Sequence, residues 1–194
     1  MPDAALGGRP RSSSAATLQE AAYELFLEVG YDAASAGEIA RRAGVSRSTF
    51  WGYLSAKSDL LWFDVDAALG RLDGELADIM QDAAVQGVKT VLDRIRRSVS
   101  RVARDFGPGD VPLPFIEVDN MRVAAELRAS GFSRLGRLVD SFARLLRASG
   151  ASPAEARSMA WSEAARVIAA AEEWVAGHPR RPLGDYLANR PCYS

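Results

Sequence analysis

A run of basic side chains between Ile39 and Ser58 is the part of the chain best suited to bind a charged ligand. It contains no aspartate or glutamate, and its cations are Arg41, Arg42, Arg47 and Lys57. Clustered cations of this kind are the expected electrostatic footprint of a protein on a phosphate backbone. The net charge of −1 over 194 residues gives no such signal, and a charge run is often only a solvated face. The interpretation therefore depends on the local structure that carries the cations.

Side chains for catalysis or metal binding are scarce. The chain has one histidine, His178, within a Gly-His-Pro sequence, and one cysteine, Cys192. This composition disfavours a histidine-based triad, a multi-histidine metal centre, a multi-cysteine site and an internal disulfide. We predict a protein that is not an enzyme and uses no metal or other cofactor, with His178 as a solvated loop residue.

Apolar residues recur at helical spacing along most of the chain and strand signals are nearly absent, so we predict an all-α fold. A capping box at Thr17–Glu20 starts the first helix, which ends at Gly30. A second capping box at 35–38 starts a short helix that runs to about residue 43. A third helix, capped by Ser46, runs through Tyr53.

The remaining helices are expected to be longer. Ser55 caps a helix over 57–82 that would be about 39 Å long. Further helices are predicted over 86–105, 115–125, 131–149, 153–176 and 182–189, with a Gly/Pro-rich loop at 107–114. We predict a disordered arm over 1–14, a small domain over 15–56 and a helical domain over 57–194.

Residues 36–53 fit the pattern of two short helices joined by a tight turn. Gly44 supplies a backbone conformation with positive φ, and the small Ala40 allows the two helices to cross closely. Ser46 caps the second helix, so that its first residues point outward. A helix presented in this way fits the DNA major groove, and the pattern predicts a helix-turn-helix. Packing alone would not require exposed cations on it.

Over residues 18–61 the sequence resembles the DNA-binding domain of TetR-type regulators. The resemblance rests on Leu-Phe-x-x-x-Gly-Tyr at the end of the first helix, followed by Glu38-Ile39-Ala40, Ala43-Gly44-Val45-Ser46, Thr49-Phe50-Trp51-Gly52-Tyr53-Leu54 and Lys57-x-x-Leu60-Leu61. It covers about a quarter of the chain without a gap.

The resemblance implies a role for each matching position. Arg47 and Ser48 are expected to contact base edges, with the arginine able to bind guanine through two hydrogen bonds. Thr49 is expected to contact a base, a thymine methyl group or a phosphate. Tyr53 and Lys57 match positions that bind phosphates, as does the helix N-terminus at Ser35 and Ala36.

Three positions depart from the family pattern. Trp51 stands where a tyrosine is usual, although its indole N–H can still donate to a phosphate. Gly52 removes a side chain that could face DNA, and Ala34 replaces a common hydroxyl residue. Arg9 and Arg11 could reach a flanking minor groove, or they could belong to an idle tail.

For residues 57–194 the resemblance implies a ligand cavity and a two-fold homodimer made by the last two long helices. The alanine-rich helix 153–176 could approach its symmetry mate closely, or its alanines could pack inside one monomer. Aromatic, soft and unusual polar residues are the candidate cavity walls, and each could instead be plain core: Trp62, Phe63, Phe106, Phe115, Asp119, Asn120, Met121, Phe142 and Trp161.

The expected function is a cytoplasmic, DNA-binding transcription regulator that acts as a homodimer on a palindromic double-stranded operator. The leading hypothesis is a repressor that a small-molecule effector releases from DNA. The alternative is a regulator that is constitutive or controlled by a protein partner. The sequence has no stretch long and apolar enough to suggest a membrane span.

Overall fold

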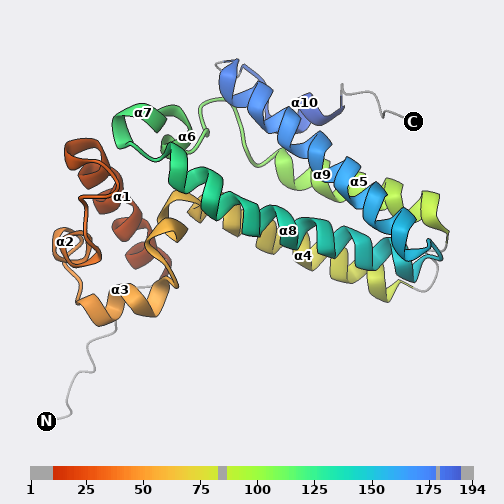
Figure 1. Cartoon of the computed structure of the whole chain (residues 1–194), viewed down its shortest axis with the longest axis horizontal. Coiled ribbons are helices and arrows are strands. Elements are labelled where there is room, and N and C mark those ends of the chain that lie inside the picture. The colour runs from red at the N-terminus through yellow and green to blue at the C-terminus, as the bar shows by residue number, and fades with distance from the viewer. Residues whose placement is uncertain (1–10, 83–86, 178–179, 189–194) are drawn as a thin grey trace, which may run out of the picture. The chain divides into compact units, whose positions relative to one another are not determined.

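The computed structural model describes residues 11–82, 87–177 and 180–188. Within these ranges the regular elements are helices and no strand occurs (Figure 1), which confirms the predicted all-α fold. His178, Cys192 and Arg9, which the predictions above concern, lie outside the described ranges.

The chain divides into two compact units. The first unit holds the chain up to Phe63 together with Glu117–Leu127. The second holds Asp64–Ile116 together with the chain from Arg128 onward. The division therefore differs from the predicted boundary at residues 56 and 57, because a segment from the middle of the chain belongs with the N-terminal residues.

The first unit is organised around α1 (Arg11–Val29). This helix contacts α2 (Ala36–Arg42), the 3₁₀ helix η1 (Lys57–Leu61) and α7 (Val118–Met121), and α3 (Arg47–Tyr53) packs on α2. The fully buried side chains of the first unit include Leu18, Phe26, Ile39, Phe50, Leu61, Met121 and Val123. The predicted three-helix domain is present, and two buried residues from later in the chain complete it.

The start of α1 differs from the prediction. The helix begins at Arg11, so Thr17 lies inside it and does not cap it. Residues 11–14, which were assigned to the arm, are helical, while residues 1–10 lie outside the described ranges. No proline or glycine stands between Pro10 and Gly30 to stop the helix earlier.

The predicted helix over 57–82 is broken near its start. A 3₁₀ helix occupies Lys57–Leu61, and α4 (Phe63–Gln81) has 19 residues, or about 28 Å. The carboxylate of Asp59 accepts the backbone N–H groups of Ser55 and Ala56, at 3.0 and 2.9 Å. The side chain of Asp59 therefore caps the start of this 3₁₀ helix. The predictions of a Ser55 cap and of a helix about 39 Å long were wrong.

The second unit contains most of α4 and α8 (Ala124–Ala148), with α5 (Val88–Ala103), α6 (Leu113–Ile116), α9 (Pro153–Ala176) and α10 (Leu183–Ala188). The predicted capping box that starts α9 at Ser152 is confirmed. Each long helix and α10 contributes to one apolar core, for example through Leu72, Ile95, Phe142, Trp174 and Leu187.

The region 113–149 was the least accurately predicted part of the chain. The expected helix over 115–125 is two single turns, α6 and α7, and Arg122 ends α7 in the left-handed conformation at φ 56°. The next helix, α8, then begins at Ala124 rather than near residue 131. It continues through Gly131 and Gly136 because buried residues such as Phe142 and Leu146 offset the low helix propensity of glycine.

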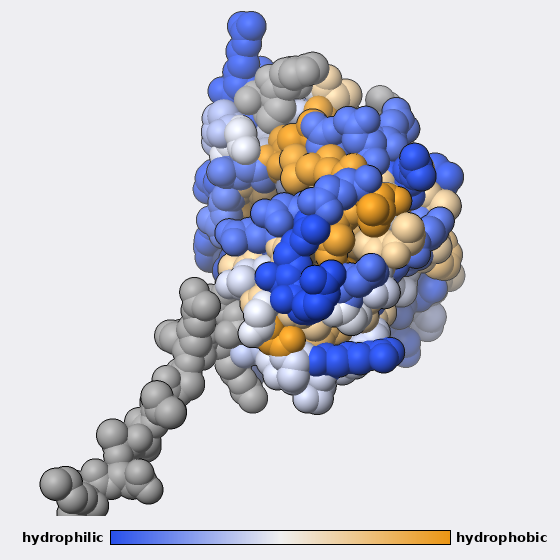
Figure 2. All heavy atoms as spheres, turned by 90° about the vertical axis from the view of Figure 1, so that its left-hand side faces the viewer, coloured by the Kyte–Doolittle hydropathy of each residue, from blue (hydrophilic) through white to orange (hydrophobic). Residues whose placement is uncertain are grey.

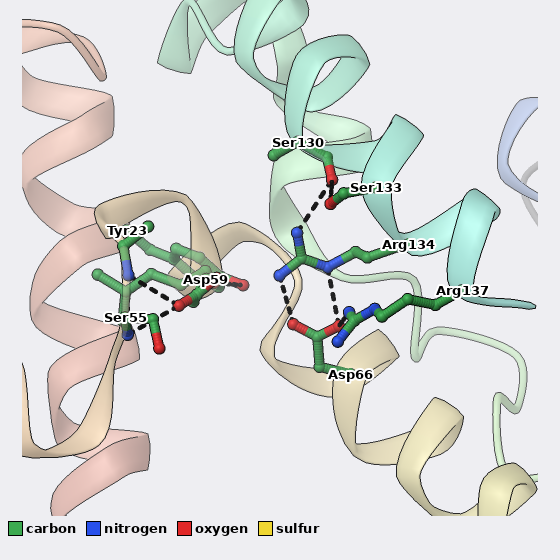
Figure 3. A network of polar contacts seen from close by, with 10 residues as sticks. Tyr23, Ser55, Asp59, Asp66, Ser130, Ser133, Arg134 and Arg137 are labelled. Atoms are coloured by element: carbon green, nitrogen blue, oxygen red, sulfur yellow. Dashed lines mark hydrogen bonds and ion pairs between the residues drawn. The ribbon is translucent and has the colours of Figure 1, made fainter.

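Two buried arginine–carboxylate groups join helices of the second unit. Arg134 donates through Nε to Asp66 at 2.8 Å and through Nη1 to the Ser130 carbonyl at 3.1 Å, and Arg137 also points toward Asp66 (Figure 3). Glu163 accepts from Arg96 on α5 and from Arg166, whose Nε lies 3.0 Å from its oxygen. Burial opposes the charged form of Glu163, but these hydrogen bonds hold its pKa below the ordinary value.

Hydrophilic residues cover most of the face drawn in Figure 2, and apolar residues gather there in a band. The large apolar side chains that are more than a third exposed include Trp51 on α3, Phe132 on α8, and Trp161 and Ile168 on α9. No helix in the described ranges combines the length and apolarity that a membrane span requires.

Candidate nucleic-acid interface

The start of α2 is fixed by the predicted capping box. The Ser35 hydroxyl accepts the N–H of Glu38 at 3.2 Å, and the Glu38 carboxylate accepts the N–H and the hydroxyl of Ser35 at 2.9 and 2.7 Å. These hydrogen bonds lower the pKa of Glu38. The backbone N–H and the hydroxyl of Ser35 therefore both donate to Glu38. Among the described contacts of α2, the backbone N–H of Ala36 donates to no carboxylate.

The turn between α2 and α3 has the conformation predicted for it. Gly44 has φ +69°, a value that a residue with a Cβ rarely adopts. The N–H of Val45 donates to the carbonyl of Ala40 at 2.9 Å, and the Ser46 hydroxyl accepts the N–H of Thr49 at 3.0 Å. The turn and both helix ends are thus hydrogen-bonded internally.

The α3 helix has one buried anchor and an exposed face. Phe50 is fully buried, and the ring of Trp51 meets it edge-on at a centroid distance of 4.9 Å. Arg47 and Ser48 are exposed at the N-terminal end, and Trp51 is 44% exposed. Thr49 and Tyr53 are half-buried. The anchor fixes the helix while its first turn stays open to a ligand.

The four cations of the predicted basic cluster are not equivalent. Arg42 donates from both terminal nitrogens to the two carboxylate oxygens of Glu28 on α1, at 2.6 and 2.7 Å, and lies 3.6 Å from Glu24. This pairing lowers the pKa of Glu28. Within the part of the chain that the structure describes, Arg41 and Arg47 have no ion pair. Arg42 therefore joins α1 to α2, and Arg47 is the cation at the start of α3.

Lys57 is tied to the segment after α1. Its ammonium group donates to the carbonyls of Tyr31 and Ala34, at 2.7 and 3.0 Å, and lies 3.9 Å from the centre of the Tyr31 ring. Burial lowers the pKa of Lys57 and raises that of Tyr31. An ammonium group has three N–H bonds, so one is left for a further acceptor.

The sequence of this region matches a known family of proteins. Residues 18–61 match the model of the bacterial regulatory proteins of the tetR family. The N-terminal part of the chain is thus a TetR-family domain. The matched segment spans most of α1, then α2, the turn, α3 and η1.

Two proteins that resemble this chain are named as regulators. The chain is 35% identical over 86 residues to a Mycobacterium tuberculosis protein provisionally named as the mycofactocin biosynthesis transcriptional regulator MftR. That match covers 44% of this chain and 42% of the relative, so the chain spans less than half of the relative's length. A solved structure, Thermus thermophilus FadR, is a TetR-family transcriptional repressor in complex with lauroyl-CoA. It is 25% identical, with a TM-score of 0.49 and coverage of 90% and 89% of the two chains.

The predicted DNA contacts are carried by α2 and its N-cap Ser35, by α3 and by η1. Arg47, Ser48 and Trp51 are exposed as the prediction requires. Ala34 is fully buried, and its carbonyl accepts from Lys57. A hydroxyl residue at that position would therefore lie in the packed interior of this protein.

The nine predicted effector-binding residues are divided between the two units. Asp119, Asn120 and Met121 belong to the first unit, as do Trp62 and Phe63. Met121 is fully buried there, and its carbonyl accepts the N–H of Tyr31 at 2.8 Å.

The other four predicted effector-binding residues are spread over the second unit. Phe142 is fully buried in its core, and Phe115 packs against that core. Trp161 is 37% exposed on α9. Phe106 lines an open pocket of about 470 Å³ between α4 and the segment 105–113, with Arg71, Asp105 and Asp110 among its walls.

The sequence contains no signal for several contacts that shape these units. The sequence suggests that Arg42 and Lys57 bind phosphates. Their partners Glu28 and Tyr31 are distant in sequence and contact them only in the folded protein. The segment 117–127 carries no pattern that assigns it to the first unit. Asp59 could have been recognised as a cap, since it follows Ala56 at the spacing of a capping box.

Proposed function

We propose that this protein is a sequence-specific DNA-binding transcription regulator. The main support is the structure of α3. This helix is capped by Ser46 and anchored by the buried Phe50, and its first turn exposes Arg47 and Ser48. A helix end with an unpaired arginine and a hydroxyl suits the major groove, where guanine offers two acceptors to an arginine.

The phosphate contacts form the second part of the proposal. The donors we assign to phosphates are the indole N–H of Trp51, the hydroxyl of Tyr53 and the backbone N–H of Ala36. Lys57 can use its third N–H for a phosphate while it keeps its two carbonyl partners. Ser35 makes such a contact only if its N–H or its hydroxyl leaves Glu38.

Selection of bound sequences from a pool of random duplexes tests the DNA-binding proposal. The full chain should enrich one motif, and its affinity should fall steeply with salt as phosphate contacts release counterions. Failure to enrich any motif at low salt would refute sequence-specific binding.

We also propose a homodimer that binds a palindromic operator. On α9, Trp161 and Ile168 are 37% and 38% exposed and lie seven residues apart, on one helix face. Alanines of α9 such as Ala160 and Ala164 are buried in the chain's own core, so the exposed apolar pair, rather than those alanines, supports a subunit contact. A two-fold dimer would present two α3 helices about 34 Å apart, one DNA turn.

The double variant Trp161→Glu/Ile168→Glu tests this dimer. It should sediment as a monomer and bind a palindromic site far more weakly than the parent protein. The control variant Met80→Glu changes an apolar residue that is 48% exposed on α4 and should keep the dimer. A monomeric parent, or a dimer that survives the double substitution, would contradict the assignment.

For regulation, we propose release from DNA by a small molecule that binds the second unit. We place the ligand in the open pocket beside Phe106, because it contains one of the predicted effector-binding residues and its volume of about 470 Å³ lies within the range of small-molecule sites. Its walls combine an aromatic ring with Arg71 and Asp105, which form an ion pair at 3.1 Å. A ligand there would act by favouring one conformation of the body.

One observation favours the alternative, a regulator without a small-molecule effector. The pocket beside Phe106 and a second pocket of about 440 Å³ near Met80 are both open rather than enclosed. A screen of compounds by thermal shift separates the two proposals. A hit that raises Tm and lowers DNA affinity supports the effector; a hit whose effect survives Phe106→Ala would move the site elsewhere.

A further inference from the structure

The N-cap of α3 contains three hydroxyl groups in mutual contact. The Ser46 Oγ lies 2.8 Å from the Ser48 Oγ and 2.8 Å from the Thr49 Oγ1. It also accepts the backbone N–H of Thr49 at 3.0 Å. Ser48 is exposed and Thr49 is half-buried on the helix that the proposed function directs into the DNA groove.

The number of hydrogens at Ser46 limits what its neighbours can do. A serine hydroxyl has one O–H donor and two acceptor lone pairs. The N–H of Thr49 uses one lone pair, which leaves one lone pair and one hydrogen for two hydroxyl contacts. Ser46 therefore donates to one of Ser48 and Thr49 and accepts from the other. No capacity is left on Ser46 for a direct contact with DNA.

The two neighbouring hydroxyls consequently differ in what they present outward. The hydroxyl that receives the hydrogen of Ser46 keeps its own hydrogen and can donate to guanine N7 or O6, to thymine O4 or to a phosphate. The hydroxyl that donates to Ser46 has only lone pairs left and can accept only from the amino group of adenine or cytosine. Reversing one hydroxyl requires reversing the other.

We propose that Ser46 is a positioning residue that couples the base preferences of Ser48 and Thr49. Within the coupled pair, one hydroxyl can donate to DNA as well as accept, and the other can only accept. The two positions are therefore read jointly rather than independently. This inference rests on the proposed DNA-binding function and concerns how the α3 helix discriminates between sequences.

A double-mutant cycle on the full chain tests the coupling. The variants are Ser48→Ala, Thr49→Val and the double variant, each measured for affinity on the enriched duplex and on its single base-pair changes. Thr49→Val frees Ser48 from the shared arrangement, so it should change discrimination at the base pair read by Ser48. Because one neutral hydrogen bond is at stake, the expected departure from additivity is about fivefold.

Ser46→Gly provides a second measurement, because glycine is tolerated at N-caps at a small cost in helix stability. It should relax discrimination at both base pairs while keeping binding. Ser152→Gly, which removes the equivalent cap of α9, is the matched control and should leave the preferences unchanged.

The possible results are distinct. Additive effects of Ser48→Ala and Thr49→Val on discrimination, or unchanged preferences in a folded Ser46→Gly variant, would overturn the coupling while leaving DNA binding intact. A parent chain that enriches no motif would instead overturn the proposed function.

Discussion

Substitution of Lys57 tests separately whether this residue stabilises the first unit and whether it binds DNA. The substitution Lys57→Met keeps the length of the apolar stem and removes the ammonium group. The carbonyls of Tyr31 and Ala34 then lose their donor, and both residues are buried. A buried carbonyl left without a partner costs about 1–3 kcal/mol, and loss of a cation–π contact about 0.5–1 kcal/mol.

The side chain of Lys57 is half-buried, so water can reach part of the cluster and the lower end of these ranges applies. We expect the free energy of opening of the first unit to fall by about 2–3 kcal/mol. Amide hydrogen exchange of α1–α3 measures this quantity for the first unit alone. Lys89→Met, on the exposed face of α5, is the control and should change exchange by little.

DNA binding by the same variant completes the test. If the third N–H of Lys57 contacts a phosphate, the salt slope of binding should fall by about one unit. A variant with unchanged hydrogen exchange and a reduced slope would show that Lys57 serves the phosphate alone. That result would refute the inference that it stabilises the segment after α1.

The buried carboxylate of Glu163 offers a stability test: Glu163→Gln leaves Arg96 and Arg166 without their shared counter-charge and should lower the free energy of unfolding by about 3 kcal/mol, and an unchanged urea midpoint would contradict this. Because the folded-state pKa of Glu163 lies below 4.5, its contribution is present above about pH 4.5 and declines as the pH falls through the lower, folded-state value. The acid-unfolding curve of Glu163→Gln should lack this component. At Gly44, φ is +69° and nothing lies within 4 Å of an added Cβ, so Gly44→Ala should cost about 1 kcal/mol through conformation alone. Gly44→Asn should recover much of that loss, and equal stability of the alanine and asparagine variants would argue against this cause.

Local signals in the sequence predicted local structure well. The capping boxes at Ser35 and Ser152 and the N-cap at Ser46 are correct because each depends on residues three positions apart. The positive φ of Gly44 was predictable for the same reason. The prediction of a helix start at Thr17 was wrong because no residue upstream stops the helix. A capping-box pattern inside a helix does not start a new one.

Contacts between residues distant in sequence account for the remaining errors. Met121 is as suitable for a packed core as for a ligand pocket, and only the fold assigns it to the first unit. The same limit applies to Arg42: a cation in an acid-free run looks available for phosphate until Glu28 on α1 meets it. A sequence pattern identifies side chains that can do a given chemistry, but their partners in the fold decide which remain available.

We infer that the first turn of α3 reads DNA sequence, and a substitution of Arg47 provides a direct test. Selection of bound duplexes should be carried out in parallel with the parent chain, Arg47→Ala and the control Arg147→Ala, which removes an exposed cation from α8. The parent and the control should enrich the same motif, whereas Arg47→Ala should lose preference at one base pair per half-site. An Arg47→Ala variant that enriches the unchanged motif with unchanged discrimination would refute base reading by the first turn of α3.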